Sequence, residues 1–278
     1  MKFWMRISQI RRCATHLLAN HNNIVRGDQI VSLGKLVCGD GANACVANTA
    51  LDHLATSIDR FSNKSVRYLN EEFSEEAESF GAFCARVTLE NACAALVGRI
   101  DPFRILYLTE FQSQSGFEYG KPARSGFKWT GDVFSEDKPP RDLWSAEQDI
   151  SKVSRALFSP HMEHVCWKPA IEVALDFLAS YAGEGDISEL QGVDPDNFIG
   201  SAKGRCATLY STLSKGVHWE FFTSAVMMDE GTLKDTLRDC FIQLCALGFF
   251  SHFIQTSYRS LDRESALAAY LGFRGQFQ

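Results

Sequence analysis

The sequence lacks the short motifs that identify the commonest enzyme chemistries. Its 278 residues contain no GxxxxGK[ST] phosphate loop, no GxSxG elbow, no HExxH motif and no CxxC pair. The glycine-containing segment "CGDGANAC" also lacks the Lys that would reach a phosphate. We therefore predict no cofactor and no metal, and any catalytic role has to rest on a less specific pattern.

Long apolar runs are missing as well. None approaches the roughly 18 residues of a membrane span, and "MKFWMRISQIRRCATHLL" has charges throughout, unlike a secretory signal. The nine Cys are odd in number and scattered among apolar neighbours, where free thiols behave as small hydrophobes. We expect a cytoplasmic protein with reduced thiols and no membrane partner.

Proline is scarce, at 7 residues against 21 Phe, and hydrophobic residues make up 45% of the chain. A disordered chain has fewer apolar residues and a larger net charge, so this composition indicates a folded protein with a sizeable core. The net charge of −6 argues against attraction of the whole molecule to nucleic acid. A local basic patch remains compatible with it.

Apolar residues recur at helical spacing through most of the chain. The clearest pattern begins at Ser74, a suitable N-cap that three Glu follow, and ends near Gly98 and Pro102. Pro169 is placed to open another helix. Further helices are predicted over residues 3–19, 42–61 and 145–158, from 198 onward, and in the last two segments, 231–258 and 260–273.

Residues 112–141 interrupt this pattern with Gly, Ser, Pro, charge and aromatics, which favours a long loop or a small hairpin. The order of elements predicts a mainly α-helical multi-helix bundle. One arrangement has two helical lobes flanking the insertion, with domains over 1–111, 112–144 and 145–278.

Two segments have the ingredients of a contact surface for nucleic acid or an acidic protein. The N-terminal helix presents a basic face, and the insertion interleaves aromatic rings with cations, a combination that suits stacking plus charge. The candidate residues are Arg6, Arg11, Arg12, Lys121, Arg124, Lys128 and Trp129.

The segment "SPHMEHVCW" places His161, His164 and Cys166 close together, but a structural zinc site needs four ligands, usually in two pairs. We interpret it as a polar interhelix loop. His252, in "GFFSHFIQ", is interpreted as a hydrogen-bonded core histidine, and Cys240 and Cys245 as core residues.

The stretch "LYSTLSKGVHWEFF" (209–222) gathers Tyr210, Lys215 and His218 in a turn-like interruption between apolar runs. It resembles a recurrent segment of HEPN-like helical domains, and "ARVTLENACAALVGRIDPFRILYL" is similar to their earlier helices. The resemblance implies an all-helical fold. Active members of that family are metal-independent RNases, usually dimeric, in which Arg precedes His by four to six intervening residues and the His acts as general acid or base.

At the matching histidine this pattern is absent, because residues 211–213 are Ser, Thr and Leu. The spacing occurs instead at Arg11–His16 and Arg155–His161. The resemblance therefore favours a non-cleaving accessory or scaffold subunit of a prokaryotic, defence-related assembly, which binds a larger protein subunit or forms a homodimer. The alternatives are an RNase using His218, Lys215, Tyr210 and Arg205, and a nucleic-acid-binding accessory protein.

Overall fold

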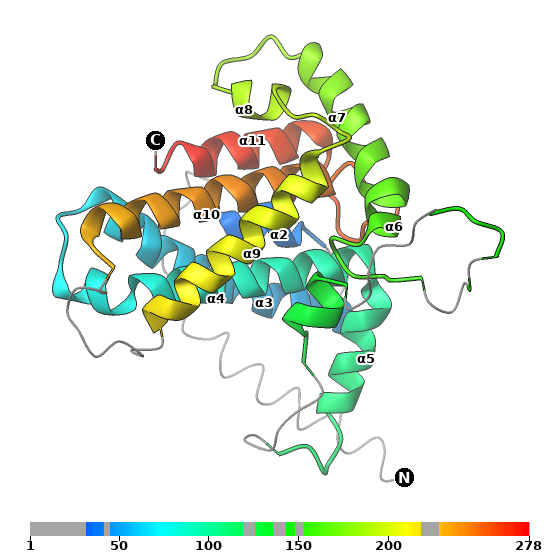
Figure 1. The fold of residues 1–278 in the computed structure, drawn as a ribbon, viewed down its shortest axis with the longest axis horizontal. Helices are drawn as coiled ribbons and strands as arrows, with labels where there is room; N and C mark the ends of the chain where they lie inside the picture. Colours follow the sequence, from blue (N-terminus) through cyan, green and yellow to red (C-terminus); the bar gives the residue numbers. More distant parts are fainter. Residues whose placement is uncertain are drawn as a thin grey trace. The chain divides into compact units, whose positions relative to one another are not determined.

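A computed structural model of the chain describes residues 32–41, 45–118, 126–135, 143–147, 149, 153–217 and 228–277. The chain divides into a unit of residues 1–30, which lies outside the described residues, and a unit of residues 31–278. The second unit is a mainly α-helical multi-helix bundle, as predicted, and contains no strand in its described residues (Figure 1).

The longer helices are α3 (Val46–Asn70), α4 (Glu75–Ile100), α5 (Pro102–Gln112), α7 (Lys168–Ala179), α9 (Phe198–Val217), α10 (Glu230–Ser251) and α11 (Arg263–Arg274). Shorter ones are α2 (Leu33–Cys38), α6 (Pro160–Met162) and α8 (Ser188–Gln191). A five-residue π turn, Glu163–Trp167, joins α6 to α7, and a second π-type turn covers Trp129–Val133.

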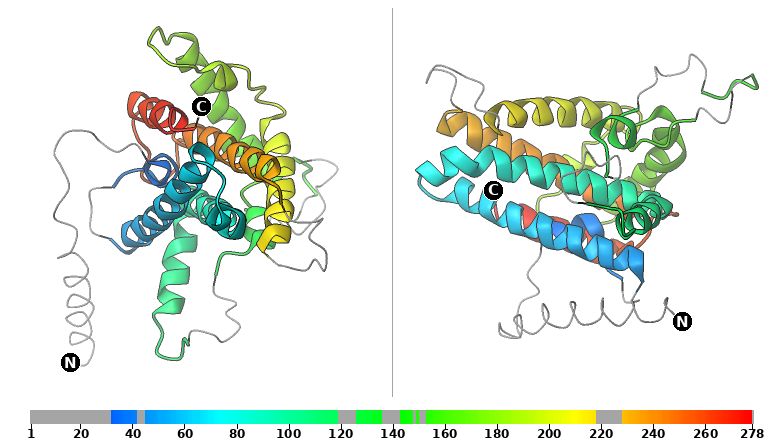
Figure 2. Two further views of the ribbon diagram at one scale, coloured as in Figure 1. Left: turned by 90° about the vertical axis from the view of Figure 1, so that its left-hand side faces the viewer. Right: turned by 90° about the horizontal axis from the view of Figure 1, so that it is seen from below.

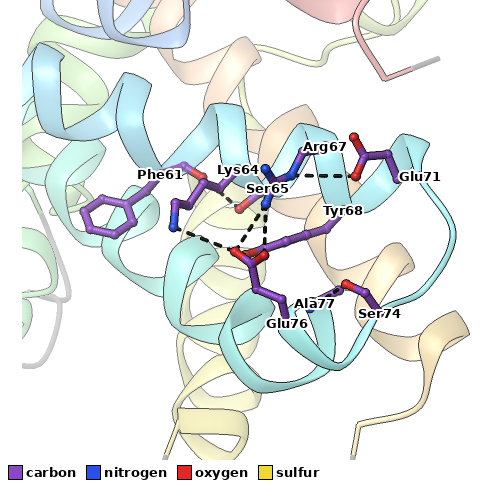
Figure 3. Close-up of polar contacts among 9 residues, drawn as sticks. All are labelled: Phe61, Lys64, Ser65, Arg67, Tyr68, Glu71, Ser74, Glu76 and Ala77. Atoms are coloured by element: carbon purple, nitrogen blue, oxygen red, sulfur yellow. Dashed lines mark hydrogen bonds and ion pairs between the residues drawn. The ribbon is translucent and has the colours of Figure 1, made fainter.

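Helices α3 and α4 form an antiparallel hairpin that is closed by a polar cluster around Glu76 (Figure 3). Arg67 donates to both Glu76 carboxylate oxygens at 3.2 Å, and the Tyr68 hydroxyl donates to one of them at 2.8 Å. Burial and this hydrogen bond raise the pKa of Tyr68 to about 12. The predicted cap is confirmed, because the Ser74 hydroxyl accepts the Ala77 N–H at 3.2 Å.

The core lies where α4 packs on α3, α9 and α10, with α2 inserted among α3, α10 and α11 (Figures 1 and 2). Three thiols, Cys93, Cys206 and Cys240, are fully buried where α4, α9 and α10 meet. Cys240 and Cys245 are core residues, as predicted. The described helices of the predicted N-terminal and C-terminal lobes therefore share one hydrophobic core.

Helix α4 is also the one described helix long and apolar enough to cross a membrane by length and composition. Its most apolar window is 67% buried inside the protein, and α3, α9 and α10 cover it. It is a core helix of the bundle.

Some predicted boundaries are wrong, because tertiary packing overrides local propensity. The described residues of 145–158 contain no helix, since Leu157 and Phe158 donate backbone hydrogen bonds to Asp132 and Val133 at 2.9 and 3.1 Å. In the insertion, residues 126–135 form a turn with no hairpin. The interhelix loop expected at "SPHMEHVCW" is helical and continues into α7.

Other boundaries move by a few residues. Helix α3 continues to Asn70 rather than ending near 61, and α4 passes through Gly98 to Ile100. Helix α9 runs unbroken to Val217, so the first nine residues of "LYSTLSKGVHWEFF" are helical and not turn-like. The predicted helix over residues 3–19 lies outside the described residues.

Candidate functional site

The most exposed apolar surface among the described helices lies on α5. Four of its eleven residues are large, apolar and exposed, and only Ile105 is buried. We call these four residues the α5 stripe: Phe103 (64% exposed), Leu106 (45%), Tyr107 (53%) and Phe111 (48%). Their i, i+3, i+4, i+8 spacing puts them on one face, and neighbouring rings lie 6.1 and 6.4 Å apart, centroid to centroid.

Helix α5 forms locally because Pro102 occupies its first position and the aromatic rings pair one turn apart. It is attached to the bundle through Ile105, which packs so closely on α4 that a Cβ at Gly98 would lie 2.2 Å from the Ile105 Cδ1. The rest of α5 extends away from the bundle (Figures 1 and 2). An isolated helix of this length is marginal in water, so α5 depends on its contacts with α3 and α4.

The turn at residues 126–135 is fastened to the base of α5. The guanidinium of Arg104 pairs with the buried carboxylate of Asp132, and the Lys128 N–H donates to the same carboxylate at 2.8 Å. Gly131 has φ of +112°, a backbone conformation that other residues rarely adopt, which permits the tight turn. The insertion is therefore built into the bundle at this point.

Trp129 of this turn meets Tyr210 of α9, so two residues proposed from different segments lie together. Their rings stack at a centroid distance of 4.3 Å and an interplanar angle of 16°. Arg86 of α4 donates to the Tyr210 hydroxyl at 3.0 Å, and its guanidinium carbon lies 4.8 Å from the ring centroid. Arg86 also pairs with Glu90 at 3.2 Å. Sequence reasoning missed Arg86, because it lies 124 residues from Tyr210.

Of the other RNase candidates, only Arg205 and Lys215 lie within the described residues. Arg205 is exposed and lines a cleft between α9 and α10, whereas Tyr210 faces Arg86 of α4. Lys215 is exposed near the end of α9, and His218 lies outside the described residues. The RNase alternative stays a prediction, and Arg86 is the cation that the structure places at Tyr210.

Of the proposed nucleic-acid contacts, Lys128 is exposed and Trp129 is half-buried, with one face against Tyr210 and an edge toward Phe134. Arg6, Arg11, Arg12, Lys121 and Arg124 lie outside the described residues. Trp129 therefore contributes to packing, and nucleic-acid binding also stays a prediction.

No group of three His, Cys, Asp or Glu side chains suited to a metal ion occurs in the part of the chain that the structure describes. His161 and His164 contact the edge of Trp144, at centroid distances of 6.1 and 5.0 Å. Burial raises the pKa of Cys166.

His252 is a hydrogen-bonded core histidine, as predicted. It lies beside Arg99, which is fully buried, and donates from Nε2 to the Leu36 carbonyl at 2.7 Å. Its Nδ1 accepts from Arg99 and from the Leu261 N–H, each at 3.0 Å. Since Nδ1 has two donors facing it, the ring is neutral with its proton on Nε2. This arrangement is structural.

The eight described cysteines differ sharply in surroundings. Cys45 is exposed at the start of α3, and its Sγ lies 3.1 Å from the Tyr258 hydroxyl. That hydrogen bond and the N–H groups of Asn48 and Ala47 lower the pKa of the Cys45 thiol. Burial raises the pKa of Cys38 to about 12, and it also raises the pKa of Cys84, Cys166, Cys240 and Cys245. A hydrogen bond with Cys206, together with burial, raises the pKa of Cys93.

We expect iodoacetamide at pH 7 to alkylate Cys45 first among these eight, because the thiolate is the nucleophile. Peptide mapping by mass spectrometry after short labelling times measures the order. Tyr258→Phe removes the largest cause of the lowered pKa, so it should slow labelling of Cys45 and leave Cys166 unchanged. Equal rates for Cys45 and Cys166 in the wild type would contradict this expectation.

Comparison of the chain with protein-family models, with curated proteins and with solved structures gave no match. The fold and the α5 stripe define an all-α bundle protein with an exposed aromatic helix, and the HEPN-like relationship stays a prediction.

Proposed function

We propose that this protein is a non-catalytic helical accessory subunit that binds a larger protein through the α5 stripe. The observation that carries the proposal is an eleven-residue helix with four large apolar side chains in water and one in the core. Single exposed apolar residues are ordinary, but a contiguous apolar patch is typical of an interaction surface. We propose that the assembly is prokaryotic and defence-related only because of the HEPN-like resemblance.

The geometry suits the recognition mode in which one helix lays its apolar face into a groove of its partner. Phe103, Tyr107 and Phe111 project along one side of α5, and their side chains interact with one another in pairs. Aromatic anchors dominate the energy of such interfaces, and burial of each ring is worth about 1.5–3 kcal/mol. The partner should therefore offer an apolar groove of about three helical turns.

A photo-crosslinking amino acid at position 107 of the full chain, expressed in its source cells, tests the proposal. The matched control places the same crosslinker at Phe80, an aromatic residue of α4 with 54% exposure against 53% for Tyr107. We expect one larger protein to be crosslinked from position 107 and not from position 80.

Binding of that protein, purified, should then weaken at least about 100-fold when Phe103, Tyr107 and Phe111 are all changed to Ser. Phe80→Ser should bind and melt like the wild type because the changed side chain is exposed. The triple variant also removes the ring pairs of α5, so its helical content is measured beside its affinity. Crosslinks only to a second copy of the chain would replace the proposal with a homodimer, and unchanged affinity in the triple variant would overturn it.

A further inference from the structure

A cleft of about 860 Å³ lies between α8, α9 and α10, away from the α5 stripe. Helices α9, α10 and α11 lie side by side in the views of Figures 1 and 2, and Tyr270 of α11 also lines the cleft. The volume is in the range of small-molecule sites. The hollow exists because α9 presents small residues here, Ser201, Ala202 and Gly204.

Gln243 of α10 lines this cleft and is the feature that indicates a ligand. The residue is 4% exposed, and its Nε2 is buried without a hydrogen-bond partner among the described residues. A buried amide donor without an acceptor costs about 1–3 kcal/mol, and such groups are rare in native proteins. The terminal torsion of Gln is soft, so a small rotation presents the N–H groups to an acceptor oxygen in the cleft.

Two opposite charges at the cleft have no ion-pair or hydrogen-bond partner within the described part of the chain: Arg205 on α9 and Asp239 on α10. Asp239 lies one helical turn before Gln243, on the same face of α10. The other charges are already satisfied, since Glu189 pairs with Arg274 at 2.7 Å and Asp194 accepts the Asp196 N–H at 3.1 Å.

We infer that this cleft binds a short peptide with free termini. Arg205 suits its carboxylate, Asp239 its ammonium group, and Gln243 an amide carbonyl between them. The apolar walls, Leu190, Val193, Leu209 and Ile242, suit its side chains. Nucleotides fit less well, because three carboxylates line the cleft and a phosphate group, unlike a peptide with free termini, brings no ammonium group to pair with one of them.

Calorimetric titration of the full chain with the tripeptide Leu-Ala-Leu tests the inference. We expect saturable binding with a Kd below about 1 mM. The same tripeptide with an acetylated N-terminus and an amidated C-terminus should bind at least about tenfold more weakly, because both charged contacts are lost. No heat of binding up to about 10 mM of the free-termini tripeptide would overturn the inference.

Two glycines of α9 provide a matched pair of variants. A Cβ at Gly204 or at Gly200 meets no atom within 4 Å, so both positions accept a larger side chain, yet only Gly204 lines the cleft. Gly204→Trp should abolish binding, whereas Gly200→Trp should bind like the wild type with the same helical content. Equal binding by the two variants would overturn the inference.

Polar variants test the individual contacts. Arg205→Gln and Asp239→Asn should each weaken the free-termini tripeptide about tenfold and leave the blocked tripeptide unaffected. Gln243→Leu should weaken both peptides about tenfold while the melting temperature stays equal to that of the wild type or rises, since the change removes an unpaired donor. Wild-type affinity for the free-termini tripeptide in all three variants would overturn the assignment.

Discussion

Arg99→Met is expected to destabilise the protein by about 3–5 kcal/mol, because it removes the donor that serves several buried oxygen atoms. The Arg99 side chain is fully buried, and its Nε donates to the Tyr258 carbonyl at 2.9 Å. Its Nη1 donates to the Val37 carbonyl at 3.0 Å and to the Ser251 hydroxyl at 2.6 Å. Leaving such acceptors buried without a donor costs about 1–3 kcal/mol each.

None of the hydrogen-bond partners described for Arg99 is a carboxylate. Its positive charge is instead balanced by helix dipoles. Val37 and Ser251 lie in the last turns of α2 and α10, so the guanidinium sits at two helix C-termini, where the helix dipoles are negative. Burial lowers the pKa of Arg99 to about 10, which still leaves it protonated at neutral pH. Arg99 thus ties together the ends of two helices and the loop that contains Tyr258.

Urea unfolding of the wild type, Arg99→Met and Arg99→Lys measures the effect. Lys keeps the charge but cannot donate to all the acceptors that the forked guanidinium reaches. The Arg99→Lys variant should therefore lose less stability than Arg99→Met. A Met variant within about 1 kcal/mol of the wild type would show that the junction contributes little net stability, as happens when buried charges cost as much as they gain.

Local signals in the sequence were sufficient to predict most helices of the bundle. The Ser74 cap with three following Glu marks the start of α4. Pro169 lies in the first turn of α7, but helical residues 160–167 precede it, so it does not mark where the helical segment begins. These signals act within one helical turn, so they need no knowledge of the fold. The same signals could not show that the described residues of 145–158 form no helix, because the backbone of Leu157 and Phe158 donates to residues 132 and 133 instead.

The candidate surfaces could not be predicted in the same way. The apolar residues of α5 have the pattern of a core helix, and only its placement at the end of α4 leaves Phe103 and Tyr107 in water. The contact between Arg86 and Tyr210 depends on the packing of α4 against α9. The one local hint of the cleft was the group of small residues near the start of α9, Ser201, Ala202 and Gly204.

Mild acid should destabilise the protein through His252, beginning below about pH 6.5. Burial and the nearby charge of Arg99 lower the pKa of His252 to about 3, whereas the unfolded chain binds the proton at its usual pKa near 6.5. Between these values the unfolded state holds more protons, so stability falls as the pH falls. The predicted loss reaches about 4 kcal/mol near pH 3.

The hydrogen bonds of His252 also indicate that acid destabilises the folded protein. A proton on Nδ1 would displace the hydrogen bonds from Arg99 and from the Leu261 N–H, and it would place two positive charges 3.0 Å apart. Asp262 is the only acidic group that acts on His252 among the described residues, and it favours protonation less than burial opposes it. His252 therefore takes up a proton readily only when the protein unfolds.

Urea unfolding between pH 7.5 and 4.5 measures this effect, because most carboxylates remain ionised over that range. Burial raises the pKa of Asp59 and of Glu163, so protonation of these two groups acts with the opposite sign. The wild type should lose about 1 kcal/mol per pH unit below pH 6. His252→Gln keeps one acceptor and one donor but cannot titrate, so it should be less stable at pH 7.5 and show a flatter pH dependence. An identical slope in both proteins would assign the acid sensitivity to other groups, and His53→Gln, which changes an exposed histidine of α3, provides the control.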